Sequence, residues 1–219
     1  MADSGADFTV TSLPGAELRQ VSVSEVDNNC YLLTDTSTGA QLLIDAADDA
    51  PTLLRMVEHG SPGDDLRLDL VVTTHQHWDH HRALKHVVEA TGARTAAGEE
   101  DADALPVRVD DRLRHLDRVR VGDLVLDVVH LRGHTPGSVA LAWTDGDGLV
   151  HLFTGDSLFP GGVGNTQGDP ERFTSLLNDV ETRLFDVYPD STVVYPGHGK
   201  GTTLGTERPH LPEWRDRGW

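Results

Sequence analysis

The sequence predicts an α/β protein in which two β-sheets carry helices on their outer sides. Strand-type runs, a helix, more strand-type runs and another helix follow one another in two successive halves of the chain. No segment rich in proline, glycine or serine divides these halves, and 219 residues fit one domain of ordinary to large size. We therefore expect residues 1–219 to form a single domain.

The first half opens with three short β-type runs, at residues 18–23, 29–35 and 40–46. The turn sequence at residues 36–39 separates the last two runs, which predicts adjacent antiparallel strands. Residues 50–60 then carry a helical pattern, with Pro51 near the start and Gly60 as the stop.

A second strand and helix complete this half. Residues 68–74 ("LDLVVTT") form an apolar run of strand type. Residues 79–92 follow, with apolar side chains at positions 84, 87 and 88. This spacing predicts a helix that begins at Asp79 and takes Gly92 as its C-cap.

The strand-type runs of the second half lie at residues 118–121, 124–131, 137–144, 148–156 and 191–199. The first two flank the dipeptide Gly122–Asp123, which predicts a β-hairpin. The next two flank "DGDG" and form a further pair. Residues 170–187 predict a long amphipathic helix that begins near Pro170.

Composition and charge exclude several classes of partner. The chain has 36 acidic and 18 basic residues, a net charge of −18, and no cluster of lysine and arginine that would bind phosphate. We therefore expect no nucleic-acid partner and no anionic membrane surface. A small-molecule substrate remains as the expected partner, and the oligomeric state stays open.

The compartment is predicted from three further features. No apolar run approaches the roughly 20 residues that cross a bilayer, and residues 1–10 lack the basic and apolar regions of a secretory signal. Cys30 is the only cysteine, which excludes an internal disulfide and suits a reducing interior. We expect a cytoplasmic protein, with Cys30 as a small core residue.

Histidines and aspartates gather where the predicted strand at residues 68–74 ends. The motif His75-x-His77-x-Asp79-His80 follows that strand directly. In an extended segment, residues two apart point to the same side, so His75 and His77 can reach one metal ion. Asp79 and His80 lie where the chain turns into the next helix, so they can face a second ion.

Three more ligand-type side chains follow predicted strands, namely His134 in "GHTPGS", Asp156 in "TGDSLF" and His198 in "PGHG". The surrounding glycine and proline residues let the backbone bend tightly. Each site alone could be an ordinary turn. Four sites at strand ends together predict one shared rim of ligands.

The ligand chemistry indicates the class of metal. Five imidazoles and two carboxylates without a thiolate suit zinc, iron or manganese. Seven ligands are too many for one tetrahedral ion. They fit two divalent ions, with zinc as the first choice, that are bridged by the carboxylate of Asp156. The expected distance between the two ions is about 3.5–4 Å.

In order and context, "THQHWDH", "GHTPGS", "TGDSLF" and "PGHG" resemble the metallo-β-lactamase superfamily. The resemblance spans roughly residues 30–199. It implies an αββα sandwich of two mixed sheets with the site at the rim between them. By similarity, one ion would be held by His75, His77 and His134, and the other by Asp79, His80 and His198, with Asp156 bridging.

Within the superfamily, "HWDH" and "TGDSLF" most resemble the glyoxalase II-like (hydroxyacylglutathione hydrolase-like) enzymes. Full-length enzymes of that group use a C-terminal helical domain to bind glutathione, whereas only 20 residues follow Gly199 here. We therefore expect a member without that domain. The resemblance implies that metal-bound water, as hydroxide, attacks the carbonyl of a small-thiol thioester, and that Asp79 takes part in catalysis as well as binding metal.

Two other reactions remain open on the same scaffold. A persulfide dioxygenase would use one Fe(II) held by His75, His134 and Asp156. Trp78 favours the hydrolases, because the dioxygenases tend to carry a small residue at that position. A lactonase would use nearly the same metals as the thioester hydrolase.

Four features near the motifs have open roles. Asp45 ends the run at residues 40–46, where an aspartate of this superfamily supports a ligand histidine, although a simple strand-ending acid is an equal alternative. Tyr195 and Lys200 flank the last ligand loop and could contact substrate. Residues Gly161–Gly164 could gate substrate entry or form an ordinary connection.

Overall fold

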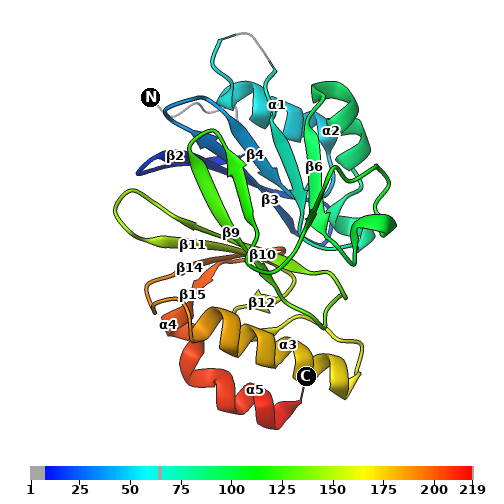
Figure 1. Ribbon diagram of the computed structural model, residues 1–219, viewed down its shortest axis with the longest axis vertical. Coiled ribbons are helices and arrows are strands. Elements are labelled where there is room, and N and C mark those ends of the chain that lie inside the picture. The colour runs from blue at the N-terminus through cyan, green and yellow to red at the C-terminus, as the bar shows by residue number, and fades with distance from the viewer. Residues whose placement is uncertain (1–7, 64–65, 219) are drawn as a thin grey trace.

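The computed structural model describes residues 8–63 and 66–218, in which two mixed β-sheets pack face to face with helices on both outer sides (Figure 1). This confirms the predicted αββα sandwich. Most of the N-terminal stretch used in the signal-sequence argument, residues 1–7, lies outside the described residues. Among those described, no helix combines the length and apolar character needed to traverse a bilayer.

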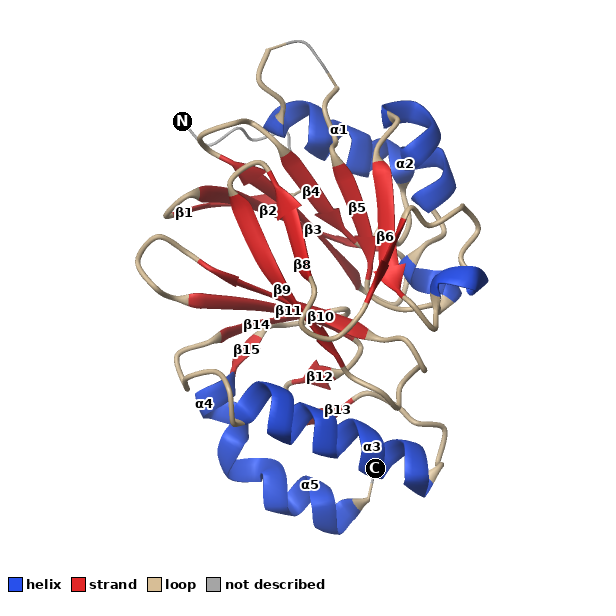
Figure 2. Ribbon diagram, in the orientation of Figure 1, coloured by secondary structure: helices blue, strands red, loops and turns tan. Residues whose placement is uncertain are grey.

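The first sheet has seven strands in sequence order, β1 (Thr9–Leu13), β2 (Ala16–Val23), β3 (Asn28–Asp35), β4 (Gln41–Ile44), β5 (Leu70–Thr73), β6 (Arg94–Gly98) and β7 (Asp111–Leu113). The strands from β1 to β4 are antiparallel, and those from β4 to β7 are parallel. Helices α1 (Ala50–Gly60) and α2 (Leu84–Thr91) cover its outer face (Figure 2).

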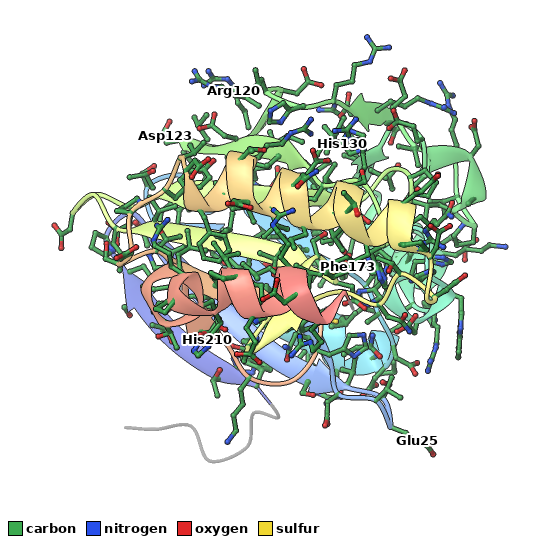
Figure 3. All side chains as sticks on the ribbon, turned by 90° about the horizontal axis from the view of Figure 1, so that it is seen from below. Glu25, Arg120, Asp123, His130, Phe173 and His210 are labelled. Carbon is green, nitrogen blue, oxygen red and sulfur yellow. The ribbon has the colours of Figure 1, made fainter. Side chains whose placement is uncertain are left out.

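The second sheet has the order β15-β14-β11-β10-β9-β8. Its strands are β8 (Arg118–Val121), β9 (Leu124–His130), β10 (Val139–Thr144), β11 (Val150–Gly155), β14 (Val193–Pro196) and β15 (Thr202–Thr203). Only β11 and β14 pair in parallel. Beneath it lie α3 (Pro170–Val180), α4 (Leu204–Glu207) and α5 (Leu211–Arg217). Figure 3 shows α3 and α5 side by side, with the buried Phe173 labelled between them.

Apolar side chains fill all three layers between these elements. One buried cluster joins the facing sides of the two sheets, with Leu33, Leu42, Leu141 and Phe153 among its members. A second lies between the first sheet and its helices, and a third between the second sheet and its helices. The rigid sandwich leaves the loops at the strand ends as the places where polar groups can meet.

The helix predicted at residues 79–92 begins later than expected. Residues Trp78–His80 form a single 3-10 turn, and α2 starts only at Leu84. The backbone of His81 has φ −145° and ψ 20°, outside the helical region, and this residue separates the 3-10 turn from α2. Gly92 closes α2 in the left-handed conformation, as predicted. The prediction that Asp79 and His80 open a helix was therefore wrong.

The helix predicted at residues 170–187 is also modified. Asp169 caps α3 by accepting hydrogen bonds from the amides of Glu171 and Arg172, and the α-helix ends at Val180. The chain then makes one π-helical turn over Glu181–Phe185. This wider turn keeps Leu184 and Phe185 buried against the second sheet.

Candidate metal centre

The predicted ligands lie in loops that follow four strands. His75 comes two residues after β5, His134 four residues after β9, Asp156 directly after β11 and His198 two residues after β14. Because the carboxyl ends of these strands meet at one rim of the sandwich, side chains far apart in sequence come together there.

All seven predicted ligand side chains converge at this rim. They form three overlapping groups whose ligand atoms lie within 4.8 Å of one another. These groups are His75, His77 and His134; His75, His80 and Asp156; and Asp79, His80 and His198. The first and third groups match the two ligand triads that the family resemblance implies.

The Asp156 carboxylate lies between the two triads. Its Oδ2 atom is 3.6 Å from Nε2 of His134 in the first triad. The same oxygen is 3.4 Å from Nε2 of His198, and Oδ1 is 3.3 Å from Nε2 of His80 in the second triad. One carboxylate therefore faces both halves of the cluster, as a bridging ligand must.

Hydrogen bonds on the far side of three imidazole rings fix which nitrogen faces the centre. Nδ1 of His80 donates to a carboxylate oxygen of Asp45 at 2.8 Å. Nδ1 of His134 donates to a backbone carbonyl at 2.8 Å, and Nδ1 of His198 does so at 2.7 Å. Because carboxylates and carbonyls only accept, each neutral ring keeps its Nε2 lone pair for the centre.

The centre contains buried nitrogen atoms that need a positive partner. Nε2 of His75 and Nε2 of His134 are buried and have no hydrogen-bond partner among the described residues. Nε2 of His80 lies 3.1 Å from Nε2 of His198, so a proton or cation must separate their lone pairs. Nitrogen and carboxylate donors in this arrangement fit divalent zinc, iron or manganese.

Asp45 supports the centre from behind. Its Oδ1 accepts from the backbone amide of Thr74 at 2.7 Å, and its Oδ2 accepts from the Thr74 hydroxyl at 2.8 Å. With its proton given to Asp45, the same hydroxyl can accept from Nδ1 of His75 at 3.1 Å. Asp45 thus orients His80 directly and His75 through Thr74.

Burial is the main influence on the pKa values of the three histidines in the first triad. Burial lowers the pKa of His75, His77 and His134, since the charged imidazolium is costly to desolvate. These three rings are therefore neutral at pH 7, the state in which imidazole binds metal.

The second triad lies beside carboxylates that favour positive charge. Burial acts to lower the pKa of His80, but Asp45 and Asp156 outweigh it and raise the pKa to about 10. The hydrogen bond to Asp156 likewise raises the pKa of His198. Burial opposes ionisation of Asp79, yet the hydrogen bond from Asn28 and the charge of His80 bring its pKa below the usual range. This half therefore demands a cation, whether proton or metal.

Sequence reasoning missed Asn28, which contacts the second triad. Its Nδ2 donates to Oδ2 of Asp79 at 3.0 Å and lies 3.4 Å from Nε2 of His198. The Ser24 hydroxyl donates to Oδ1 of Asn28 and fixes the amide orientation. The only signal in the sequence was a pair of asparagines ahead of an apolar strand-type run, and that pattern does not specify a partner.

Two glycines allow the ligands to approach closely. A Cβ atom on Gly197 would lie 2.3 Å from Oδ1 of Asp156 and 2.7 Å from a ring carbon of His80. A Cβ atom on Gly164 would lie 1.8 Å from the carbonyl oxygen of Asp156. Gly197 in "PGHG" and Gly164 in the stretch after Asp156 therefore serve packing at the centre.

The glycine stretch Gly161–Gly164 is an ordered connection. Strands β12 (Leu158–Phe159) and β13 (Gly162–Val163) pair antiparallel, so the segment is a tight hairpin. The Gly161 amide donates to the buried Glu207 carboxylate at 2.8 Å, which ties this hairpin to α4.

The two residues that flank the last ligand loop lie in different surroundings. The Tyr195 ring stacks on Phe153, and its hydroxyl lies 3.1 Å from Nδ1 of His151. Tyr195 therefore packs in the layer between the sheets, while Lys200 is exposed. Cys30 is fully buried, as expected for a core residue.

An open cleft adjoins the first triad. Its volume is about 640 Å³, and its lining includes His77, His134, Gln76, Gln167 and Arg172. Trp78 directly follows His77 in the chain and is 64% exposed. Its ring stacks on the Arg82 guanidinium, whose central carbon lies 3.6 Å from the ring centroid.

The sequence profile of the metallo-beta-lactamase superfamily matches residues 23–198, which include all seven ligand-type residues. The chain belongs to this superfamily. The match begins at the last residue of β2 and ends at His198, so it covers β3 to β14 and every loop of the centre.

Curated relatives of this superfamily member include the hydroxyacylglutathione hydrolases of Jannaschia sp. (strain CCS1) and Fuscovulum blasticum. They are 36% and 34% identical over 173 residues, which cover 78% of this chain and 62% of each relative. The chain thus spans less than two thirds of their length. A Mycobacterium leprae (strain TN) protein named as uncharacterized is 31% identical over 208 residues, 84% of this chain and 92% of that protein.

Similar solved structures include ETHE1 from Myxococcus xanthus, with 32% identity and a TM-score of 0.77 over 91% of this chain and 84% of that one. TTHA1623, solved in a di-iron-bound form, is 30% identical with a TM-score of 0.70 over 86% of this chain and 96% of that one.

Proposed function

We propose that this protein is a dinuclear metal-dependent hydrolase that cleaves the thioester of a small thiol. The observation that carries the proposal is the position of Asp156, whose carboxylate faces His134 of the first triad and His198 of the second. The relatives named hydroxyacylglutathione hydrolase support the thioester as substrate class. The di-iron form of TTHA1623 supports two ions as the loading.

The two ions, when bound, would polarise the substrate carbonyl and make water nucleophilic near neutral pH. The protein's own side chains supply the ligands and fix their orientation. The five histidines and the carboxylates of Asp79 and Asp156 would hold the ions, and Asp45 keeps His80 in the tautomer that can bind. The lowered pKa keeps Asp79 ionised at neutral pH, as a ligand carboxylate must be.

The cleft beside His77 and His134 supports a small molecule as substrate. Its volume of about 640 Å³ is in the range of small-ligand sites. Gln76 and Gln167 offer neutral hydrogen-bonding groups at its wall, and the Arg172 guanidinium donates to the backbone carbonyls of Gly133 and His134. We propose no nucleic-acid or membrane partner, in keeping with the net charge of −18.

The proposal is tested with the variant His77→Ala and the matched control His86→Ala, which removes an exposed histidine of α2. Metal content and hydrolysis of an S-acylated small thiol are measured for both. We expect the first variant to lose metal and at least about 100-fold in turnover, and the control to keep both. Undiminished thioester turnover in His77→Ala would overturn the proposal.

A mononuclear iron dioxygenase acting on a persulfide is the second candidate, favoured by the likeness to ETHE1 from Myxococcus xanthus. The two candidates differ in their need for the second triad. A dinuclear hydrolase requires His198, whereas an iron held by His75, His134 and Asp156 does not. One iron per chain, with persulfide-dependent oxygen consumption that survives His198→Ala, would favour the dioxygenase.

A lactonase remains within the hydrolases and would use the same ligands. A panel of thioesters, lactones and persulfides, assayed on protein loaded separately with zinc, iron and manganese, separates the three reactions. We expect thioesters to give the highest kcat/KM with two ions per chain.

A further inference from the structure

Asp101 is a buried carboxylate whose hydrogen bonds go to the loops of the centre and to none of the seven ligand side chains. It follows β6, is 0% exposed, and precedes the 3-10 turn Ala102–Ala104. Its Oδ2 accepts from the backbone amide of Gln76 at 3.0 Å and from the Thr135 hydroxyl at 2.5 Å. Its Oδ1 accepts from the backbone amide of Gly137 at 2.7 Å.

The three donors to Asp101 come from two loops, and both loops carry ligands of the first triad. Gln76 lies between His75 and His77, and Thr135 directly follows His134. One carboxylate therefore ties the His75–His77 segment to the His134 segment. Within the first triad, the rings of His77 and His134 lie 4.5 Å apart between centroids.

Backbone packing around Asp101 leaves little room for these loops to shift. A Cβ atom on Gly137 would lie 2.5 Å from the Asp101 amide nitrogen. A Cβ atom on Gly98 would lie 1.9 Å from the carbonyl oxygen of Gly137. The turn after β6 and the His134 loop are thus in direct backbone contact, with the Asp101 carboxylate enclosed between them.

Asp101 and Asp45 act on different halves of the centre. Asp45 bonds directly to His80 of the second triad and reaches His75 only through Thr74. Asp101 instead accepts hydrogen bonds from Gln76, directly before His77, and from Thr135, directly after His134. The two buried carboxylates therefore divide the support of the centre between them.

We propose that Asp101 is a positioning residue that sets the separation of His77 and His134 and thereby the affinity of the first triad for its metal ion. The role requires a carboxylate, because three buried donors converge on its two oxygens. An asparagine would offer one accepting oxygen and would turn an NH₂ group towards a donor. This inference rests on the two-ion centre of the proposed function, but not on the identity of the substrate.

The test compares Asp101→Asn with Asp103→Asn, which removes an exposed carboxylate two residues away that pairs with Arg112. Zinc affinity is measured by competition with a chromophoric chelator, without substrate. We expect Asp101→Asn to weaken one of the two zinc affinities about 10- to 100-fold, as loss of a supporting partner does elsewhere, and to leave the other within about twofold. Two unchanged affinities would overturn the proposal.

Two backgrounds identify the affected half. In His77→Ala, which already lacks a ligand of the first triad, Asp101→Asn should change the remaining zinc affinity by less than about twofold. In His198→Ala, which keeps the first triad, it should weaken the remaining affinity about 10- to 100-fold. Equal weakening in both backgrounds would assign Asp101 to the general fold and refute a positioning role.

Thr135→Val provides the decisive variant if Asp101→Asn does not fold. It removes one of the three donors and leaves the carboxylate in place. We expect about threefold weaker binding at the first triad only, and unchanged binding would count against the proposal. Because all these measurements are made without substrate, failure of the thioesterase assay would leave their outcome intact.

Discussion

Asp45 and His80 form a fully buried pair, with 2.8 Å between a carboxylate oxygen of Asp45 and Nδ1 of His80. Asp45 follows β4 with a backbone φ of +58°, a left-handed conformation that aspartate and asparagine adopt more readily than most residues. The turn that ends β4 therefore places the carboxylate behind the ligand ring. Residue type, backbone conformation and ligand orientation are linked at this one position.

Substitution Asp45→Asn should weaken metal binding without altering the backbone. Asparagine tolerates the left-handed conformation, but its NH₂ group would face His80 and favour the tautomer whose Nε2 carries the proton. We expect metal affinity to fall about 10- to 100-fold, measured by chelator competition. Asp49→Asn is the matched control, because Asp49 also has a positive φ and caps α1, where asparagine serves equally well. Equal losses in both variants would contradict this role of Asp45.

Substitution Gly197→Ala should disturb the bridging carboxylate. The added Cβ atom would lie 2.3 Å from Oδ1 of Asp156, so this oxygen or the loop must move. We expect at least about tenfold lower turnover and weaker binding of both ions, with the melting temperature of the metal-free protein changed much less. Gly146→Ala, whose nearest contact is Pro14 at 3.2 Å, should behave like the unmodified protein. Normal metal loading in Gly197→Ala would show that the loop adapts.

The thiol of Cys30 should be unreactive in the folded protein. Burial raises its pKa to about 12, so almost no thiolate forms at neutral pH, and the side chain has no exposed surface. Titration with a disulfide reagent should detect no thiol in native buffer and one per chain in denaturant. Rapid labelling of the native protein would mean that the strand β3 opens readily.

Asp35 should make the stability of the fold depend on pH in the acid range. Burial acts to raise the pKa of Asp35, but hydrogen bonds from the Asp123 amide and from Thr38 and Ser37 hold it well below its usual range. A lowered folded-state pKa adds stability above the unfolded value near 4, and this stability is lost as pH falls through the folded-state value.

Substitution Asp35→Asn should therefore lower the free energy of unfolding by about 2 kcal/mol at pH 7 and by less at pH 3. Urea unfolding of the metal-free protein at both pH values measures the difference. The exposed residue Asp147 supplies the control variant Asp147→Asn, which should have little effect at either pH. A difference that grows towards pH 3 would have the wrong sign for this assignment.

Local sequence patterns were sufficient to predict the helices and strands that have strong periodicity or clear end signals. Helix α1 has Pro51 in its first turn, and α2 ends at Gly92, both as predicted. Strands β6 and β7 were missed because their sequences, "RTAAG" and "DRL", have little β-type character. Parallel pairing with β5 and with each other makes them strands, and such pairing is a property of the assembled sheet.

The sequence by itself determined the ligand types and their placement after strands, because these depend on residue identity and short-range pattern. Only the tertiary structure decided their partners. Asp45 is 35 residues from His80, Asp101 is 25 from Gln76, and Asn28 is 51 from Asp79. A hydrogen bond across such separations forms only when sheet pairing and close packing have brought the two loops to the same rim, and no local periodicity encodes that encounter.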